Sequence, residues 1–349
     1  MLSEYDKIQI LRDKIQKLSR SKVSFMEVCG THTMSVAKHA IKSMLPETIN
    51  IVSGPGCPVC VTSQTDIEMS LILARSENKI ICTFGDMIKV PSKKDSLANY
   101  KNVKIIYSPL DALKIANENP DREIVLLGIG FETTTPLIAV TIKTAMQECI
   151  KNFSVLSMHK TVPTALKLIL SSPDISLNGL ILPGHVSAVT GRKYFDFIKD
   201  YHTCGVVAGF EALDIMECIY LLTKSVEENK IEVINNYTRI VSEEGNQLAM
   251  QLLYEVFEDC DCQWRGIGEI PNSGLKIREK FQAYDAKIKF NIPVMNIPEP
   301  KNCRCGEILM AKKTPPDCSL FKNTCTPLNP IGPCMVSSEG TCAAYYKYL

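Results

Sequence analysis

The sequence predicts an α/β fold, with two α/β domains built on mostly parallel sheets and a helical and irregular C-terminal region. From about residue 48 to residue 225, short apolar runs alternate with stretches of helical periodicity, which is typical of parallel sheets covered by helices. After about residue 225 the composition becomes polar and then rich in Pro and Cys. These two observations define the fold class and separate the sheet domains from the tail.

The expected elements follow from the spacing of the apolar residues. The first 20 residues carry apolar side chains at helical spacing and predict an amphipathic helix. Compact apolar runs predict strands at 23–28, 49–53, 79–84, 103–107, 123–130, 153–158, 179–184 and 205–210. Helical patterns predict helices at 65–76, 111–118, 136–150, 162–170 and 211–224, and longer polar helices within 225–258.

Three domains are expected from these patterns. The first α/β domain spans 1–150, because KNFS at 151–154 breaks a long helix before a new strand. The second spans 151–225, and the C-terminal domain spans 226–349. The last part of the tail has too many helix and strand breakers for regular elements, so we expect a metal centre to order it.

Composition excludes several classes of function. Lys plus Arg (39) and Asp plus Glu (38) nearly cancel, so the chain lacks the basic field that binds nucleic acid. It has no uncharged apolar run near the roughly 20 residues that span a bilayer. The N-terminus lacks the apolar core of a signal peptide. We therefore expect a cytoplasmic protein with no membrane anchor.

The 15 cysteines are the most informative part of the composition. Disulfides rarely persist in reducing compartments, so metal binding or redox chemistry is the better expectation. Three cysteines lie near the start in Gly/Pro-rich loops and six lie in the tail, which indicates two sites. We expect four isolated cysteines to serve packing as small buried hydrophobes: Cys82, Cys149, Cys204 and Cys218.

Four Gly- or Thr-rich segments each follow an apolar strand: CGTHTM, GPGCPVC, GFETTTP and PGHVSAVTG. The carboxyl ends of strands in open α/β sheets are where ligands bind, so these loops are expected to meet at one crevice. Ordinary βα turns also need Gly and a capping residue, but they do not require thiols or imidazoles. The candidate site residues are Cys29, His32, Cys57, Cys60, Glu132 and His185.

Cys29 and His32 stand at a strand-to-helix junction. Amides at a helix N-terminus lower the pKa of a thiol, so Cys29 is expected to bind iron or to act as a nucleophile. A hydrolase-type Cys-His pair is the competing interpretation, but nothing in the chain singles out an oxyanion hole. For Glu132 and His185 we expect a role as acid-base groups or as groups that support the site's ligands from outside, with a capped turn and a loop histidine as the alternatives.

Cys57 and Cys60 form a C-x-x-C motif, which suits a reversible disulfide or two ligands of one soft metal. No second C-x-x-C lies within zinc-finger distance, so a redox pair is favoured. The neighbouring glycines and prolines keep the loop irregular. We expect both thiols to be accessible.

The tail cysteines provide only thiolate ligands, which suit an iron-sulfur cluster or zinc. Their irregular gaps fit neither a zinc ribbon nor the bacterial ferredoxin pattern, so a [4Fe-4S] cluster is favoured and zinc is second. Cys303 and Cys334 are expected to be spare, although Cys303 can replace Cys305. The expected ligands are Cys305, Cys318, Cys325 and Cys342.

Taken together, five motifs resemble the HypD family of hydrogenase maturation proteins: MEVCGTHTM, SGPGCPVC, GFETT, PGHVSAVTG and the tail from CRCGEI to CAAYYKY. The resemblance covers nearly the whole chain. It implies two α/β domains around a cleft and a C-terminal domain that holds a [4Fe-4S] cluster. Ser63 departs from the family pattern, which usually has proline there, so the exit of the C-x-x-C loop is expected to be less rigid.

The resemblance also implies a function as a maturation scaffold. With a small HypC-type chaperone, the protein would hold an iron ion while carbonyl and cyanide are added to form the Fe(CN)2CO group of nickel-iron hydrogenases. The cyanide would come from a HypE-type partner. Cys29 would be the main iron thiolate, with His32 and the Cys57/Cys60 pair in the same cleft. The cluster would pass electrons to that pair.

Two other classes of function remain open at this stage. One is an iron-sulfur-linked thiol oxidoreductase that acts on a protein partner, for which Cys29 would be dispensable. The other is a zinc-stabilised interaction protein, which would be colourless and contain zinc. Because these interpretations differ on the point, whether the chain is an enzyme stays open at this stage.

Overall fold

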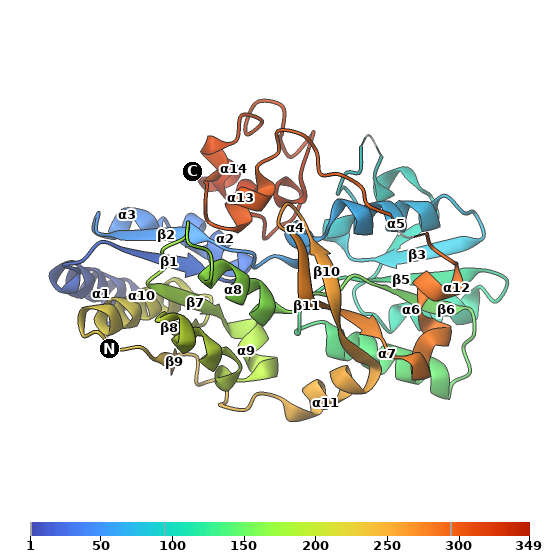
Figure 1. Ribbon diagram of the computed structural model, residues 1–349, viewed down its shortest axis with the longest axis horizontal. Coiled ribbons are helices and arrows are strands. Elements are labelled where there is room, and N and C mark those ends of the chain that lie inside the picture. The colour runs from blue at the N-terminus through green and yellow to red at the C-terminus, as the bar shows by residue number, and fades with distance from the viewer. Residues whose placement is uncertain (1, 94, 294) are drawn as a thin grey trace.

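The computed structural model describes residues 2–93, 95–293 and 295–349. It confirms an α/β protein with mostly parallel sheets: one of five strands, one of four strands, and a two-stranded antiparallel hairpin. We call the five-stranded half the first lobe and the four-stranded half the second lobe. Figure 1 shows the first lobe on the left, the second on the right and the C-terminal tail in red above them.

The first lobe has the strand order β2-β1-β7-β8-β9, and every neighbouring pair is parallel. Its core is apolar and includes Phe25, Ile181 and Val206. Helix α1 packs on α10 over one face of the sheet. The strands are β1 (Val23–Glu27), β2 (Ile49–Ser53), β7 (Gly179–Pro183), β8 (Cys204–Ala208) and β9 (Val233–Asn235). The helices are α1 (Glu4–Leu18), α2 (Gly30–Lys38), α3 (Ile41–Met44), α9 (Gly184–Thr190), η3 (Arg192–Tyr201) and α10 (Ala212–Glu227).

The second lobe has the order β4-β3-β5-β6, again all parallel. Ser63, at the position where proline was expected, caps α5: its Oγ accepts from the amide of Asp66 at 3.1 Å. A side-chain cap of this kind stabilises a helix start. The strands are β3 (Lys79–Thr83), β4 (Val103–Ile105), β5 (Glu123–Gly128) and β6 (Phe153–Ser157). The helices are α5 (Gln64–Ala74), η1 (Gly85–Met87), η2 (Leu97–Asn99), α6 (Asp111–Glu118), α7 (Thr135–Gln147), η4 (Glu279–Tyr284) and α12 (Ala286–Lys289).

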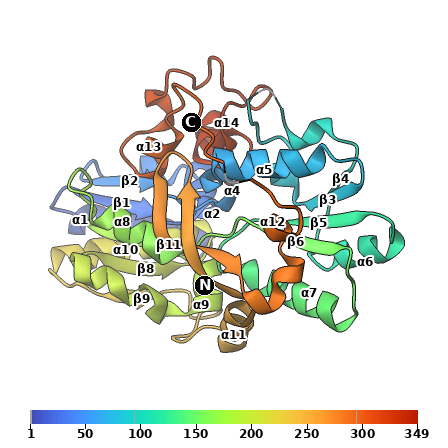
Figure 2. The ribbon, with the colours of Figure 1, turned by 45° about the vertical axis from the view of Figure 1, so that its right-hand side comes forward.

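The connections between the lobes carry the functional loops. Helix α4 (Pro58–Val61) lies where the chain first leaves the first lobe, and α8 (Val162–Leu170) lies where it returns. Helix α11 (Gln247–Val256) contacts α7 of one lobe and α9 of the other. The hairpin of β10 (Phe257–Trp264) and β11 (Gly268–Ile277) then runs between the lobes toward the tail (Figure 2).

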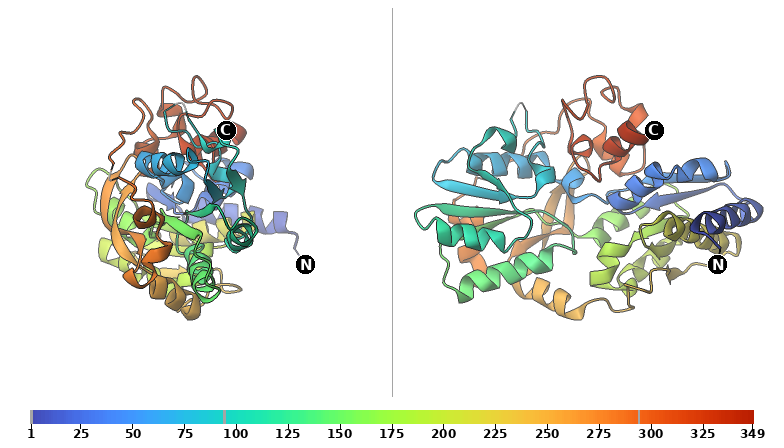
Figure 3. Two further views of the ribbon diagram at one scale, coloured as in Figure 1. Left: turned by 90° about the vertical axis from the view of Figure 1, so that its right-hand side faces the viewer. Right: turned by 180° about the vertical axis from the view of Figure 1, so that it is seen from behind.

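The strands do not divide at residues 150 and 225 as the sequence suggested. Strand β1 pairs with both β2 and β7, whereas β6, after residue 150, pairs with β5 of the second lobe. The strands of both lobes are short apolar runs of similar composition. Neither their composition nor their order along the chain therefore reveals which strands pair. Figure 3 shows both lobes from behind and from the side.

The region after residue 225 contains less helix than expected. Only α11 is a helix within 230–258, and Phe257 already begins β10, whose less and more exposed positions alternate along EDCDC. The tail contains only short helices, in line with its many Pro and Gly residues: α13 (Cys305–Leu309), η5 (Pro315–Asp317), η6 (Pro333–Met335) and α14 (Thr341–Tyr348). Within the described parts of the chain, no helix combines the length and apolar character needed to cross a membrane.

Candidate functional site

Three of the four predicted loops meet at one edge of the first lobe. CGTHTM follows β1, GPGCPVC follows β2 and the PGHVS segment begins at the end of β7, and these three strands are neighbours in the sheet. The amide of Gly30 donates to the carbonyl of Gly56 at 3.1 Å. A Cβ added to Gly56 would lie 2.4 Å from the Cα of Cys29. The glycine therefore allows the C-x-x-C loop to lie directly against the Cys29 backbone.

Gly56→Ala is expected to destabilise the protein by about 2 kcal/mol, because the new methyl group must displace backbone atoms at the loop contact. Chemical denaturation measures this loss. Gly85→Ala is the matched control, since a Cβ there meets no atom within 4 Å. Equal stability of the two variants would show that the contact between the loops is not tight.

Cys29 caps the N-terminus of α2, as the sequence indicated, but the prediction of a lowered thiol pKa is wrong. Burial, and after it the negative charge of Glu339, raise the pKa of Cys29 to about 11, although hydrogen bonds from Thr31 and His32 oppose this rise. Desolvation outweighs the amides of the helix start. The thiol is protonated at neutral pH, so a metal ion that binds it must displace the proton.

His32 and His185 both stack on Phe210, with ring centroids 4.7 Å and 3.9 Å from the phenyl ring. His32 is fully buried, and its Nε2 lies 2.9 Å from the carbonyl oxygen of Gly209. Because a carbonyl only accepts, Nε2 carries the proton and Nδ1 is the free acceptor. Burial lowers the pKa of His32 to about 4, so the ring is neutral, as a metal ligand requires.

The Nδ1 atom of His32 has no hydrogen-bond partner among the residues that the structure describes. Histidines that bind metals usually donate their other ring N–H to a carbonyl or carboxylate, which fixes the orientation of the ring. His32 has this arrangement, with the Gly209 carbonyl as the orienting group. The geometry therefore fits a ligand or acceptor role for Nδ1 near Cys29.

Cys57 and Cys60 lie at the start of the short helix α4. The Sγ of Cys57 accepts from the amide of Cys60 at 3.2 Å, and Pro58 occupies the first helical position, where its missing N–H has no cost. Both thiols are buried, at 3% and 0% exposed, so the expectation of accessible thiols is wrong. The loop is buried because the chain passes between the lobes there and the tail covers it.

The tail supplies residues to this site that sequence reasoning missed. The hydroxyl of Thr31 donates to Glu339 at 2.7 Å, which brings a carboxylate beside the Cys29 loop. The thiol of Cys57 donates to Ser337 Oγ at 3.3 Å, and Ser337 in turn donates to Asp86 at 3.0 Å. These partners are far apart in sequence, and no local pattern pointed to them.

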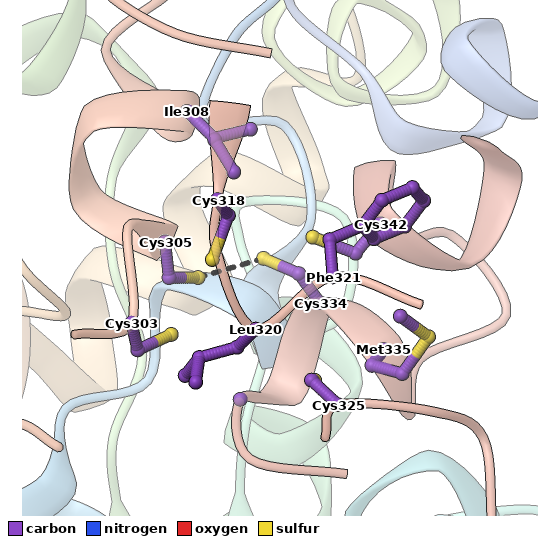
Figure 4. A pocket seen from close by; sticks show the side chains of 11 residues that line it. Cys303, Cys305, Ile308, Cys318, Leu320, Phe321, Cys325, Cys334, Met335 and Cys342 are labelled. Carbon is purple, nitrogen blue, oxygen red and sulfur yellow. Dashed lines mark hydrogen bonds between the residues drawn. The ribbon is translucent and has the colours of Figure 1, made fainter. Parts of the chain in front are cut away.

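Six tail cysteines surround one small, otherwise apolar cavity (Figure 4). They include the four predicted cluster ligands and the two that the sequence set aside as spare. The Sγ atoms of Cys305 and Cys334 are 2.8 Å apart. The thiols that line the cavity are Cys303, Cys305, Cys318, Cys325, Cys334 and Cys342.

This donor set fits an iron-sulfur cluster. In a four-iron cluster each thiolate binds a different iron, so the ligands surround a cavity instead of converging on one point. Over residues 2–93, 95–293 and 295–349, no three His, Cys, Asp or Glu side chains are arranged around a single metal ion. Burial raises the pKa of Cys325 and of Cys342, so these thiols too must lose their protons on binding iron.

The C-x-x-C pair and the cysteine cavity form one continuous region, whereas the sequence suggested two separate sites. Cys60 and Cys334 are buried in the same apolar cluster, and Cys334 lines the cavity beside Cys305. Helix α4 packs against η6, which carries Cys334. The chain thus places the Cys57/Cys60 pair beside the wall of the cavity.

Glu132 lies elsewhere. It follows β5 of the second lobe, and its Oε1 accepts from the amide of Val162 and from the hydroxyl of Tyr194, both at 2.9 Å. Tyr194 belongs to η3 of the first lobe. Glu132 therefore links the lobes, and its recorded contacts are not with the three converging loops. Burial raises the pKa of Glu132 to about 7.

The Glu132 carboxyl makes stability depend on pH. Its folded pKa of about 7 lies above the ordinary value of 4.5, so the folded state binds the proton more tightly. The stabilisation is present below about pH 4.5 and is lost as pH rises to 7, by about 3 kcal/mol. In Glu132→Gln this loss should disappear from denaturation curves at pH 5 to 8. The exposed control Glu148→Gln should behave like the unaltered protein. If the stability of Glu132→Gln still falls with rising pH, the pH dependence belongs to another group.

The isolated cysteines mostly serve packing. Cys82, Cys204 and Cys218 are buried, as expected, but Cys149 is exposed at the end of α7. The prediction for Cys149 is therefore wrong. Its backbone has a left-handed φ of 55°, which ends the helix and turns the residue toward solvent.

Comparison with known proteins agrees with the motifs. A family model for HypD, described as the "Hydrogenase formation hypA family", matches residues 6–349. The chain is 43% identical to the hydrogenase maturation factor HypD of Cupriavidus necator, covering 93% of this chain and 89% of that protein. It is 44% identical to the hydrogenase maturation factor HypD of Azotobacter vinelandii, and the match covers 93% of this chain and 88% of that protein. It is 40% identical to the hydrogenase maturation factor HypD of Escherichia coli, and that match covers 98% of this chain and 94% of the relative. The chain therefore belongs to the HypD family of hydrogenase maturation factors.

Proposed function

We propose that this protein is a scaffold on which iron receives carbonyl and cyanide ligands to become the Fe(CN)2CO group of nickel-iron hydrogenases. One observation carries the proposal: the Cys29 loop, the Cys57/Cys60 loop and the tail lie in direct contact. The site thus has a thiol and an imidazole for a metal ion, and it has a thiol pair next to a cavity lined by cysteines.

Iron is the cargo of this site, and Cys29 is its principal ligand. The Sγ of Cys29 is a soft donor in a buried position, and His32 has a neutral, oriented ring with Nδ1 free. Thiolate and imidazole together suit a first-row transition metal. Cys29 and His32 are both buried, which limits the access of water to a metal ion bound between them.

The tail cavity is proposed to hold a resident [4Fe-4S] cluster through Cys305, Cys318, Cys325 and Cys342, with Cys303 as the alternative to Cys305. Such a group supplies one-electron transfer when bound. The chain itself holds Cys60 against Cys334 at the cavity wall and presents the thiol of Cys57 to Ser337. These contacts support redox communication between the cavity and the thiol pair.

We propose two protein partners. A small HypC-type chaperone shares the iron with Cys29, and a HypE-type protein delivers cyanide. The exposed His185, stacked on Phe210 beside buried His32, lies on the solvent side of this group and offers a surface for docking. Glu132, which links the lobes, is assigned a role in holding them together instead of an acid-base role.

The contact between Cys60 and Cys334 also favours a second candidate, an iron-sulfur-linked thiol oxidoreductase that acts on a protein partner. Cys29 separates the two candidates, since only the scaffold needs it. A zinc-stabilised interaction protein is separated from both by metal content.

The test is metal analysis of the full chain, purified without oxygen together with the small partner. The proposal predicts acid-labile sulfide and iron in excess of the cluster's own, with co-purification of the partner. Zinc without sulfide would contradict it. Sulfide with no additional iron would favour the oxidoreductase.

A further inference from the structure

Arg265, at the turn between β10 and β11, carries a charge that the protein does not balance well. The side chain is 1% exposed, and its Nε, Nη1 and Nη2 atoms have no hydrogen-bond partner among the described residues. An arginine is always charged and has five N–H donors. Burying such a cation is costly unless it is paired and hydrogen-bonded, so the arrangement indicates a missing anion.

The nearest anion offsets only part of this charge. Glu299 Oε2 lies 3.2 Å from Nε, but this carboxylate is about one-third exposed and its other oxygen accepts from the amide of Gln64. Within the parts of the chain that the structure describes, the Nη1 and Nη2 edge of the guanidinium has no hydrogen-bonding partner. That edge is the part of arginine that usually binds an anion with two parallel hydrogen bonds.

Contacts of the turn place Arg265 beside the cysteine cavity. Its amide donates to the carbonyl of Val61, next to Cys60, at 3.0 Å. On the other side, a Cβ added to Gly266 would lie 2.7 Å from the N and Cα of Gly306, the residue after Cys305. Gly266 has a left-handed φ of 66°, so glycine is suited both to the turn and to this close approach.

Packing around the turn supports the same placement. Trp264, the residue before Arg265, belongs to the same buried cluster as Cys305 and Cys334 of the cavity. In a buried environment a charge acts on its surroundings much more strongly than in water.

We propose that Arg265 provides the counter-charge for the cluster and makes its reduction potential more positive. This inference rests on the proposed function. Cysteines that bind iron do so as thiolates, so negative charge gathers in the cavity on binding. An added electron increases that charge, and a fixed positive charge nearby favours the reduced state. Charge and hydrogen bonding around the sulfurs are known determinants of cluster potential.

The experiment is a redox titration of the cluster, followed by electron paramagnetic resonance, in the full-length protein. Arg265→Met should shift the midpoint potential to more negative values, whereas Arg265→Lys, which keeps the charge, should stay near the unaltered protein. Arg304→Met is the matched control. Arg304 precedes Cys305 in sequence, but its side chain is 50% exposed and paired with Glu307 at 3.0 Å, so solvent screens its charge.

A second variant tests the opposite sign. Glu299→Gln removes the partial partner of Arg265 and should shift the potential to more positive values. Potentials of Arg265→Met and Glu299→Gln equal to that of Arg304→Met would overturn the inference. If Arg265→Met assembles no cluster, the midpoint potential of Glu299→Gln tests the inference alone: a positive shift supports it, and no shift contradicts it. Absence of a cluster in every protein, the unaltered chain included, would instead contradict the proposed function.

Discussion

Cys29→Ala is expected to lose the cargo iron while keeping its fold and its cluster. The substitution removes the proposed principal ligand, and His32 Nδ1 would be the donor left beside it. Loss of an outer partner alone costs a metal site 10–100-fold in affinity, so loss of this thiolate should cost more than about 100-fold. Iron analysis after anaerobic co-purification with the small partner measures the effect.

Cys149→Ala is the matched control for this experiment, since Cys149 is an exposed thiol at the end of α7. It should keep iron and partner alike. The stability of Cys29→Ala should fall by only about 1 kcal/mol, the usual size of a small core change. Full retention of the cargo iron and of the partner by Cys29→Ala would remove the iron site from Cys29 and leave the thiol oxidoreductase as the better interpretation.

Replacing any one of Cys318, Cys325 or Cys342 by alanine is expected to abolish the four-iron cluster. Each side chain lines the cavity, and each is assigned to a separate iron of the cluster. Sulfide content and the visible absorption of the anaerobic protein report the loss. The tail has only short helices, so these variants should also show greater proteolytic cleavage after residue 300.

Cys334→Ala provides the contrast, because Cys334 lines the same cavity but also contacts Cys60. It should keep the cluster and change only the reduction of the Cys57/Cys60 pair. The pair Cys303→Ala and Cys305→Ala decides which of the two neighbours is the fourth ligand. A cluster that persists in Cys318→Ala, Cys325→Ala and Cys342→Ala would overturn the assignment.

Local patterns were sufficient to predict the elements. The expected helices at 111–118 and 162–170 coincide with α6 and α8, because apolar spacing and flanking turn residues act within a few positions. The same reasoning located Cys29 at a helix start, whereas the short helix that follows Cys57 was expected to be an irregular loop. Convergence of four loops was expected, since strand carboxyl ends of parallel sheets share an edge, and three of the four do meet there.

Long-range packing accounts for what was missed. The pairing of β1 with β7 divides the strands differently from the predicted boundaries, and Glu132 consequently follows a strand of the other sheet. Burial of Cys29 reverses the expected direction of its pKa. The contact of Ser337 with Cys57 joins residues from opposite ends of the chain. None of these features has a signal within a short window of sequence.

The most direct test of the central claim is an infrared spectrum of the full-length protein, purified anaerobically with its small partner. The account predicts stretching bands of iron-bound cyanide and carbonyl, present in the unaltered protein and absent from Cys29→Ala. Iron and sulfide without either band in the unaltered protein would contradict the assignment of this site to iron-ligand assembly.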